Sequence, residues 1–246
     1  MYPFDELRPA YDRFWSRVSA GAPWLPPSLD WDRDLHESWV EPDLAIAQTC
    51  GWPLVTELAD RVRVVGAFEP LVPGAVGHCY RSVLVGREQC AIAELMGAHA
   101  AVNSPSSLSG WVSLVAAVHG PGGAWTGTVT WTGAHRRNVV EVAEGRADVA
   151  SIDAVTWAFI SRFSPELTAG LVEIGSGPLV PSLPLITAAS TTDEQLAALR
   201  GAITAALRDS QTVSVARELC IGGFVPLDLD DYLPLLSLGG SRMRWR

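Results

Sequence analysis

Hydroxyl side chains gather in one short stretch between a predicted strand and a predicted helix. The stretch reads Asn103-Ser104-Pro105-Ser106-Ser107-Leu108-Ser109-Gly110. A helix start leaves about four backbone N–H groups unpaired and carries roughly half a unit of positive charge, so it attracts anions. The hydroxyls of Ser107 and Ser109 add donors for the same anion. Alternatively, one serine only caps the helix and the others belong to the turn.

Two further strand ends carry polar side chains. His135 follows Thr132-Gly133-Ala134 after one predicted strand, and Asp153 follows the next. In open parallel sheets ligands lie beyond the carboxyl ends of the strands, so we expect these side chains to converge on the serine-rich turn. Each also has a structural interpretation, His135 as a surface or capping histidine and Asp153 as a helix N-cap. Earlier in the chain, Thr49-Cys50-Gly51 holds the matching position, or simply forms a glycine-assisted turn.

The elements that must position these residues follow from the hydrophobic pattern. Short apolar strands alternate with amphipathic helices, which is typical of an α/β fold with parallel βαβ units. Thr192 with Gln195 has the spacing of a capping box and predicts a helix start. We predict strands at 44–47, 62–67, 80–86, 100–102, 126–132, 147–152, 171–174 and 183–186, and helices at 7–18, 53–57, 88–96, 111–118, 135–144, 154–163, 192–207 and 213–219.

Length and charge limit the possible functions. The chain of 246 residues is long enough for two small lobes that share one ligand site. Its formal net charge is -9, and basic residues cluster only at 242–246, so nucleic-acid binding is not expected. An anion must therefore be held by local dipoles and hydrogen bonds. The sequence has neither a membrane-spanning apolar stretch nor an export signal, so we expect a protein that is not membrane-embedded and, as the sequence stands, not exported.

The four cysteines do not have the spacing of a metal site. They stand at Cys50, Cys79, Cys90 and Cys220, without a CxxC pair and without a nearby histidine pair. We therefore expect no metal and no cofactor. Cys79 and Cys90 can pair if the compartment is oxidising; otherwise the cysteines act as small buried apolar residues.

Several motifs occur in an order that resembles one protein family across nearly the whole chain. The family comprises the substrate-binding proteins of phosphate/phosphite/phosphonate ABC transporters, known as the phosphonate-binding family. The motifs that carry the resemblance are Gln48-Thr49-Cys50-Gly51-Trp52-Pro53-Leu54, Tyr80-Arg81-Ser82, Ser107-Leu108-Ser109-Gly110, Thr132-Gly133-Ala134-His135, the run from Glu144 to Asp153, and Leu183-Pro184-Leu185-Ile186-Thr187.

The resemblance implies a fold and a function. The fold is the two-lobed periplasmic binding protein type II fold, in which each lobe is a mostly parallel sheet flanked by helices and the ligand cleft lies between the lobes. Lobe 1 would comprise 1–82 and 187–246, and lobe 2 would comprise 83–186. The function would be non-catalytic binding of a small phosphorus oxyanion, such as a phosphonate, phosphite or phosphate, for an ABC transporter permease. The location would be periplasmic or extracytoplasmic.

The resemblance also implies which residues bind the ligand. Serines, a histidine, an aspartate and first-lobe tyrosines hold the oxyanion in this family, and a glycine permits close approach to the helix. The residues of this chain at those positions are Ser107, Ser109, Gly110, His135, Asp153 and Tyr80, to which we add Ser106, Thr49, Cys50 and Tyr2.

The chain departs from the family pattern in three places. Leu108 stands where threonine is usual and removes one hydroxyl, which bears on ligand choice. Arg136 and Arg137 follow the histidine where small residues are usual; one of them can bind an anion, or both can be solvated at a helix start. Family members also have a strand before the position of Tyr2, so either the natural chain starts upstream of Met1 or the sheet of the first lobe lacks this strand.

Two other functions stay open at this point. One is an enzyme of the same fold in cofactor or pyrimidine metabolism, with Cys50 as nucleophile and His135 as base. The other is a cytoplasmic ligand sensor, which is suggested by the missing export signal.

Overall fold

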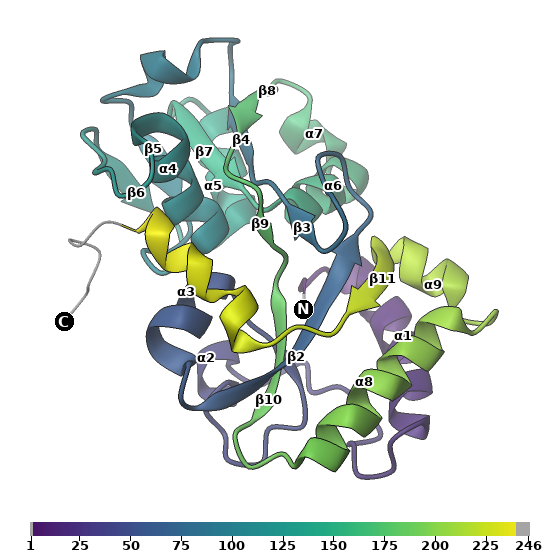
Figure 1. Cartoon of the computed structure of the whole chain (residues 1–246). Coiled ribbons are helices and arrows are strands. Elements are labelled where there is room, and N and C mark those ends of the chain that lie inside the picture. Colours follow the sequence, from purple (N-terminus) through teal and green to yellow (C-terminus); the bar gives the residue numbers. More distant parts are fainter. Residues whose placement is uncertain (1, 240–246) are drawn as a thin grey trace. The chain divides into compact units, whose positions relative to one another are not determined.

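The computed structural model describes residues 2–239 and divides them into two compact α/β units (Figure 1). Unit 1 takes the chain up to residue 71, Ala75–Cys79 and Pro181–Leu233. Unit 2 takes Val72–Gly74, Tyr80–Val180 and residues 234–239. The short strands β3 (Cys79–Tyr80) and β9 (Val180–Pro181), which pair with each other, lie where the chain passes from one unit to the other. The predicted two-lobed α/β class is confirmed; the predicted lobe ranges, 1–82 with 187–246 and 83–186, stay a prediction.

Unit 1 contains a four-stranded sheet in the order β1-β10-β2-β11. Its strands are β1 (Ala47–Gln48), β2 (Val62–Pro70), β10 (Pro184–Ala188) and β11 (Ile221–Val225). All neighbouring pairs are antiparallel, so the expectation of a mostly parallel sheet was wrong for this unit. The chain leaves unit 1 after β2 and re-enters it just before β10, and these two strands run in opposite directions side by side.

The helical connections of unit 1 still join parallel strands. Because β1 and β2 are both antiparallel to β10, they are parallel to each other, with β10 between them. The same reasoning makes β10 parallel to β11, with β2 between them. The βαβ pattern in the sequence therefore predicted strand direction correctly and strand adjacency wrongly.

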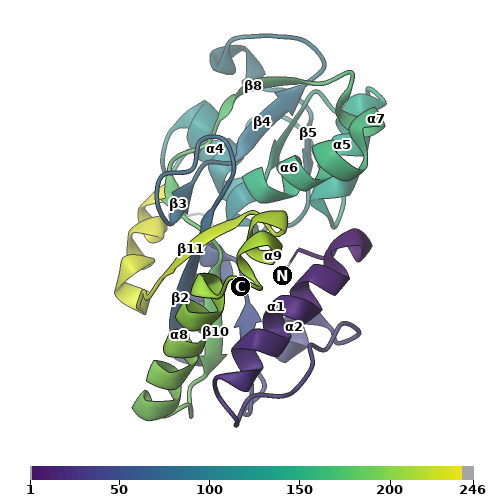
Figure 2. The ribbon, with the colours of Figure 1, turned by 90° about the vertical axis from the view of Figure 1, so that its right-hand side faces the viewer.

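Helices of unit 1 pack against this sheet and each other. Figure 2 shows α1 (Arg8–Ala20) alongside α8 (Asp193–Arg208), and α1 also contacts α9 (Val213–Glu218). The capping box at the start of α8 is confirmed: Thr192 N donates to Gln195 Oε1 at 2.9 Å and Gln195 N donates to Thr192 Oγ1 at 3.2 Å. The remaining helical segments of the unit are 3₁₀ turns at Asp5–Leu7 and Leu229–Asp231, α2 (Leu35–Ser38), α3 (Gly51–Pro53) and a π-helical turn at Leu54–Leu58.

Unit 2 contains a five-stranded mixed sheet in the order β6-β5-β7-β4-β8. β5 (Ala100–Val102) runs parallel to β6 (Val129–Trp131) and to β7 (Val149–Ile152). β4 (Val83–Gly86) is antiparallel to β7 and to β8 (Val172–Ser176). The carboxyl ends of β5, β6 and β7 therefore lie at one edge of the sheet, and the polar connections predicted to bind ligand follow these ends.

Helices cover both faces of this sheet. Leu114 of α4 (Ser113–His119) packs with Leu84, Ala100 and Val102 in one buried cluster. α5 (His135–Ala143) packs against β4, β5 and β7, and side-chain alternation turns residues such as Ala101 to the face opposite Ala100. The other helical segments are a 3₁₀ turn at Ile92–Leu95, a π-helical turn at Leu108–Val112, α6 (Ala154–Phe163), α7 (Pro165–Thr168) and a 3₁₀ turn at Leu233–Leu238.

None of the helices described between residues 2 and 239 is both long and apolar enough to cross a bilayer.

Two glycines should respond to alanine substitution in opposite directions. Gly66 lies in β2 at φ +150°, and an added Cβ would lie 2.4 Å from Val225 O, so Gly66→Ala should destabilise the protein by about 2 kcal/mol or more. An added Cβ at Gly201 in α8 meets nothing within 4 Å, so Gly201→Ala should stabilise it by about 0.5–1 kcal/mol. Urea unfolding midpoints measure both changes, and equal shifts of the same sign would contradict this packing.

Candidate functional site

The serine-rich turn after β5 caps the helical segment that leads into α4. Ser107 has extended backbone angles (φ -80°, ψ 121°), and its Oγ accepts from Gly110 N at 2.9 Å. Its carbonyl oxygen accepts from both Trp111 N and Val112 N, so the helix begins with a wide π-helical turn. The capping role of Ser107 is therefore observed, and a ligand-binding role stays a prediction.

Gly110 is needed because Asn103 occupies the space next to it. A Cβ at residue 110 would lie 1.9 Å from Asn103 Oδ1 and 3.1 Å from Ser107 Oγ. Asn103 Oδ1 is buried and has no hydrogen-bond partner within residues 2–239. The close packing predicted for Gly110 thus involves a neighbouring amide side chain of the same turn.

Ser109 and His135 meet at the starts of two helical segments. Ser109 Oγ lies 2.9 Å from His135 Nε2, and the tautomer of the ring decides which atom donates. Ser151 on β7 donates through its Oγ to Ser109 O at 2.5 Å. These contacts join the connections that follow β5 and β6 to the middle strand β7, as the parallel arrangement predicted. We call Ser107, Ser109, Gly110 and His135 the serine–histidine site.

Burial lowers the pKa of His135 below its ordinary value of 6.5, while the charge of Asp153 and the backbone carbonyl of Ser151 act in the opposite direction. Nδ1 of the ring is buried and has no partner of full hydrogen-bond geometry in the described part of the chain. The imidazole is therefore neutral near pH 7. When Nε2 of the neutral ring donates to Ser109 Oγ, the hydroxyl of Ser109 keeps its own hydrogen for an anion, and the pair brings no net charge to the site.

Asp153 is held by two hydrogen bonds of its own unit. Its Oδ1 accepts from Thr156 N at 2.8 Å, which confirms the N-cap interpretation, and its Oδ2 accepts from Tyr80 OH at 2.7 Å. Asp153 is 2% exposed and Tyr80 is 1% exposed. These bonds stabilise a buried carboxylate, and Asp153 lies close enough to His135 to influence its pKa.

Polar side chains beside the site stabilise the two connections. Ser106 Oγ lies 2.9 Å from Ser104 Oγ within the serine-rich turn. After β6, Thr132 Oγ1 donates to Asn138 Oδ1 at 2.5 Å. Arg137 Nη1 donates to Thr132 O at 3.2 Å, and both Arg136 and Arg137 are exposed at the start of α5.

The predicted residues Tyr2, Thr49 and Cys50 belong to unit 1. Thr49 follows β1, is 2% exposed, and its Oγ1 is buried with no hydrogen-bond partner among the residues the structure describes. Cys50 is half-buried at the N-cap of α3, and Tyr2 is half-buried near the start of the chain. A role of these three residues in ligand binding stays a prediction.

The structure thus brings six of the predicted residues together in two groups of unit 2, Ser107, Ser109, Gly110 and His135 in one and Tyr80 with Asp153 in the other. Sequence reasoning did not single out Asn103 and Ser151, which determine how Gly110 and Ser109 pack. Asn103 opens the serine-rich stretch and Ser151 lies in the run from Glu144 to Asp153, so their positions in these segments were the available signal.

No group of three or more histidine, cysteine, aspartate or glutamate side chains within residues 2–239 has an arrangement that could hold a metal ion. No disulfide joins the four cysteines, all of which lie in this range. Burial raises the pKa of Cys79, and burial together with Glu94 raises that of Cys90, so both thiols are poorly ionised at neutral pH.

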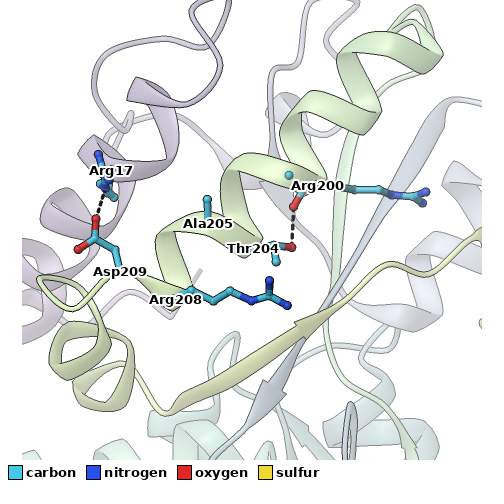
Figure 3. A pocket seen from close by; sticks show the side chains of 7 residues that line it. Arg17, Arg200, Thr204, Ala205, Arg208 and Asp209 are labelled. Carbon is cyan, nitrogen blue, oxygen red and sulfur yellow. Dashed lines mark hydrogen bonds and ion pairs between the residues drawn. The ribbon is translucent and has the colours of Figure 1, made fainter.

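A surface depression of 630 Å³ lies on unit 1 beside α1 and α8 (Figure 3). Arg17, Arg200 and Arg208 line it. Arg17 Nε is paired with Asp209 at 2.6 Å, and Arg200 Nη2 contacts Asp228 Oδ1 at 2.8 Å. Two of the three guanidinium groups thus pair with acidic side chains of the protein itself.

The fold is that of the type II periplasmic binding proteins. A binding component of an ABC phosphonate transporter from Pseudomonas aeruginosa resembles the chain with 17% identity and a TM-score of 0.71, over 97% of this chain and 83% of that one. A methylphosphonate complex from Prochlorococcus marinus has 11% identity and a TM-score of 0.72, over 96% of this chain and 92% of that one. An ATP complex from Xanthomonas citri has 17% identity and a TM-score of 0.69, over 96% of this chain and 95% of that one. No curated protein sequence matches the chain.

Residues 43–232 match the model of the family described as ABC transporter, phosphonate, periplasmic substrate-binding protein. This match covers well over half of the 246 residues. The chain therefore belongs to this family, and the predicted resemblance is confirmed. It is a substrate-binding protein of the ABC-transporter type.

The shifted pKa of His135 predicts a pH dependence. Between the lowered folded-state pKa and the unfolded value near 6.5, the unfolded chain binds more protons. The contribution of His135 to stability is thus complete above about pH 6.5 and is lost as the pH falls through the folded-state pKa. NMR titration of the His135 ring should give a pKa below 6.5, and a value at or above 6.5 would show that the ring is not desolvated.

Proposed function

We propose that this protein binds a small phosphorus oxyanion at the serine–histidine site and delivers it to an ABC transporter permease. The observation that carries the proposal is the 2.9 Å contact between Ser109 Oγ and His135 Nε2 at the edge where parallel strands end. The ligands of two structural relatives support it, since methylphosphonate and ATP share a tetrahedral phosphorus centre with anionic oxygens. Phosphonate, phosphite and phosphate have this chemistry in common.

Local hydrogen bonds are sufficient for this binding. Hydrogen bonds to a charged group contribute about 1.5–3 kcal/mol each, so three or four of them approach the roughly 8 kcal/mol of micromolar affinity. The net charge of -9 opposes anion binding at long range, so selectivity depends on the preorganised donors. Leu108 is buried and supplies only its backbone, so the proposed site has one hydroxyl fewer than the family motif.

We propose further that the protein is not an enzyme and that it acts outside the cytoplasm, as the family description implies. The competing enzyme hypothesis needs Cys50 as nucleophile and His135 as base. His135 Nε2 already forms a hydrogen bond with Ser109 within unit 2, and Cys50 stands at the N-cap position of α3 in unit 1. A ligand-binding role for Ser106, Tyr80, Asp153, Tyr2, Thr49 and Cys50 belongs to the same proposal.

Ser109→Ala should weaken methylphosphonate binding about tenfold to a hundredfold, because one charge-assisted donor is lost and His135 loses its partner. Isothermal titration calorimetry measures the change. The matched control is Ser113→Ala, which removes a buried hydroxyl four residues further along the same helical segment and should leave the affinity unchanged. Equal effects of the two substitutions would place the ligand elsewhere.

Methylphosphonate and phosphite should be recovered unchanged after long incubation with the protein. Phosphorus NMR measures both compounds directly. Cys50→Ser should keep affinity within about threefold, since the change replaces one small side chain with another of similar shape. Turnover by the wild type that disappears in Cys50→Ser would establish the enzyme hypothesis instead.

A further inference from the structure

One buried serine contacts both members of the Ser109–His135 pair. Ser151 lies on β7, between β5 and β4 in the sheet of unit 2, and is 0% exposed. Its Oγ donates to the backbone carbonyl of Ser109 at 2.5 Å. Its own backbone carbonyl lies close enough to the ring of His135 to act on it as a hydrogen-bond acceptor. Because no part of Ser151 reaches the surface, this residue can affect a ligand only through its neighbours.

The bond from Ser151 determines where the π-helical turn Leu108–Val112 lies on the sheet. It is made to the main chain of Ser109, so it fixes the backbone of that residue and, with it, the position of the Ser109 side chain. The accepting residue is buried, since Ser109 is only 5% exposed. Loss of the donor would leave a buried carbonyl without this partner, which favours a shift of the turn.

The ring of His135 completes a closed set of contacts. It meets Ser109 Oγ at 2.9 Å through Nε2 and lies beside the backbone carbonyl of Ser151. The three residues follow or belong to the neighbouring strands β5, β6 and β7, so each of them is held by the other two. An imidazole with a polar group on two sides keeps one orientation, because the partner of one nitrogen determines what the other nitrogen can do.

We propose that Ser151 is a positioning residue for oxyanion binding, which holds Ser109 Oγ at hydrogen-bond distance from His135 before the ligand arrives. This inference rests on the proposed function and adds a residue that does not itself contact the ligand. Donors that are ordered in advance lose fewer conformations on binding and therefore bind more tightly. Affinity for the oxyanion thus depends on a hydroxyl group that is buried within the sheet.

The first test measures methylphosphonate affinity by calorimetry. Ser151→Ala should weaken binding about 3- to 30-fold, because the turn that carries Ser109 loses its bond to β7. Ser151→Cys keeps a similar volume and a weak donor, so its affinity should lie between those of Ser151→Ala and the wild type. In a protein that already carries Ser109→Ala, the change Ser151→Ala should have little further effect, since residues that act through one another are not additive.

The second test is the ring of His135, which reports on position and does not depend on added ligand. Burial lowers the pKa of this ring in the wild type. In Ser151→Ala the shifted turn should admit water to the ring and raise its pKa toward the ordinary value of 6.5. NMR titration of the ring measures this change.

Thr187→Val is the matched control. Thr187 lies on β10 of unit 1, is 0% exposed, and its Oγ1 also donates to backbone carbonyls, those of Leu44 at 3.1 Å and Ala45 at 2.9 Å. Its loss should lower the melting temperature at least as much as Ser151→Ala does, because more bonds are removed. Both the methylphosphonate affinity and the pKa of His135 should nevertheless stay at their wild-type values.

The outcomes separate this inference from the proposed function. Unchanged affinity in Ser151→Ala, or an affinity loss without a change in the ring pKa, overturns the positioning role while the proposed function stands. Losses of affinity in Ser151→Ala and Ser109→Ala that simply add in the double variant also overturn it. A wild type that does not bind methylphosphonate overturns the proposed function and the binding role of Ser151 together.

Discussion

The contact between Ser109 and His135 is the constraint on which the candidate site depends. It joins the connection after β5 to the connection after β6, and these connections lie together only because the two strands are parallel neighbours. Ser151 on β7 donates a hydrogen bond to the backbone carbonyl of Ser109. Asn103 lies where a side chain at residue 110 would begin, so only glycine fits there. Three strand ends thus position the hydroxyl of Ser109 and the ring of His135, so the arrangement of the sheet determines the arrangement of the site.

The electrostatics of the site favour donors that carry no net charge. Burial keeps His135 neutral, and the carboxylate of Asp153 accepts from Thr156 N and from Tyr80 OH, which lowers the cost of burying it. In a chain of net charge -9, recognition of an anion then depends on the direction and spacing of N–H and O–H groups. Under the proposed function, such a site would distinguish tetrahedral oxyanions by shape more than by charge.

Much of the fold could be predicted from local pattern. The range of β5, the start of α6 at Ala154 and the capping box at Thr192 agree with the sequence prediction, because periodicity and cap chemistry depend on neighbours in the chain. The helix predicted at 88–96 is only a 3₁₀ turn at Ile92–Leu95, and the helix predicted from Trp111 begins earlier as a π-helical turn at Leu108. The mostly parallel sheet predicted for the first lobe was wrong, because β10 enters between β1 and β2 and β2 lies between β10 and β11. Strand order depends on pairing between segments that are distant in the chain, and the spacing of hydrophobic residues within one segment does not reveal which strands pair.

By itself the sequence determined the family and the residues at the strand ends, because motif order and the chemical types of Ser107, Ser109, His135 and Asp153 can be read without coordinates. Only the tertiary structure decided which of these residues contact one another. It paired Ser109 with His135 and Tyr80 with Asp153, and it brought Trp131 to Trp111. The physical reason is that hydrogen bonds and ring contacts act over a few ångströms, whereas the residues that form them are 20 to 73 positions apart in the chain. These residues come into contact only when the sheet of unit 2 has formed.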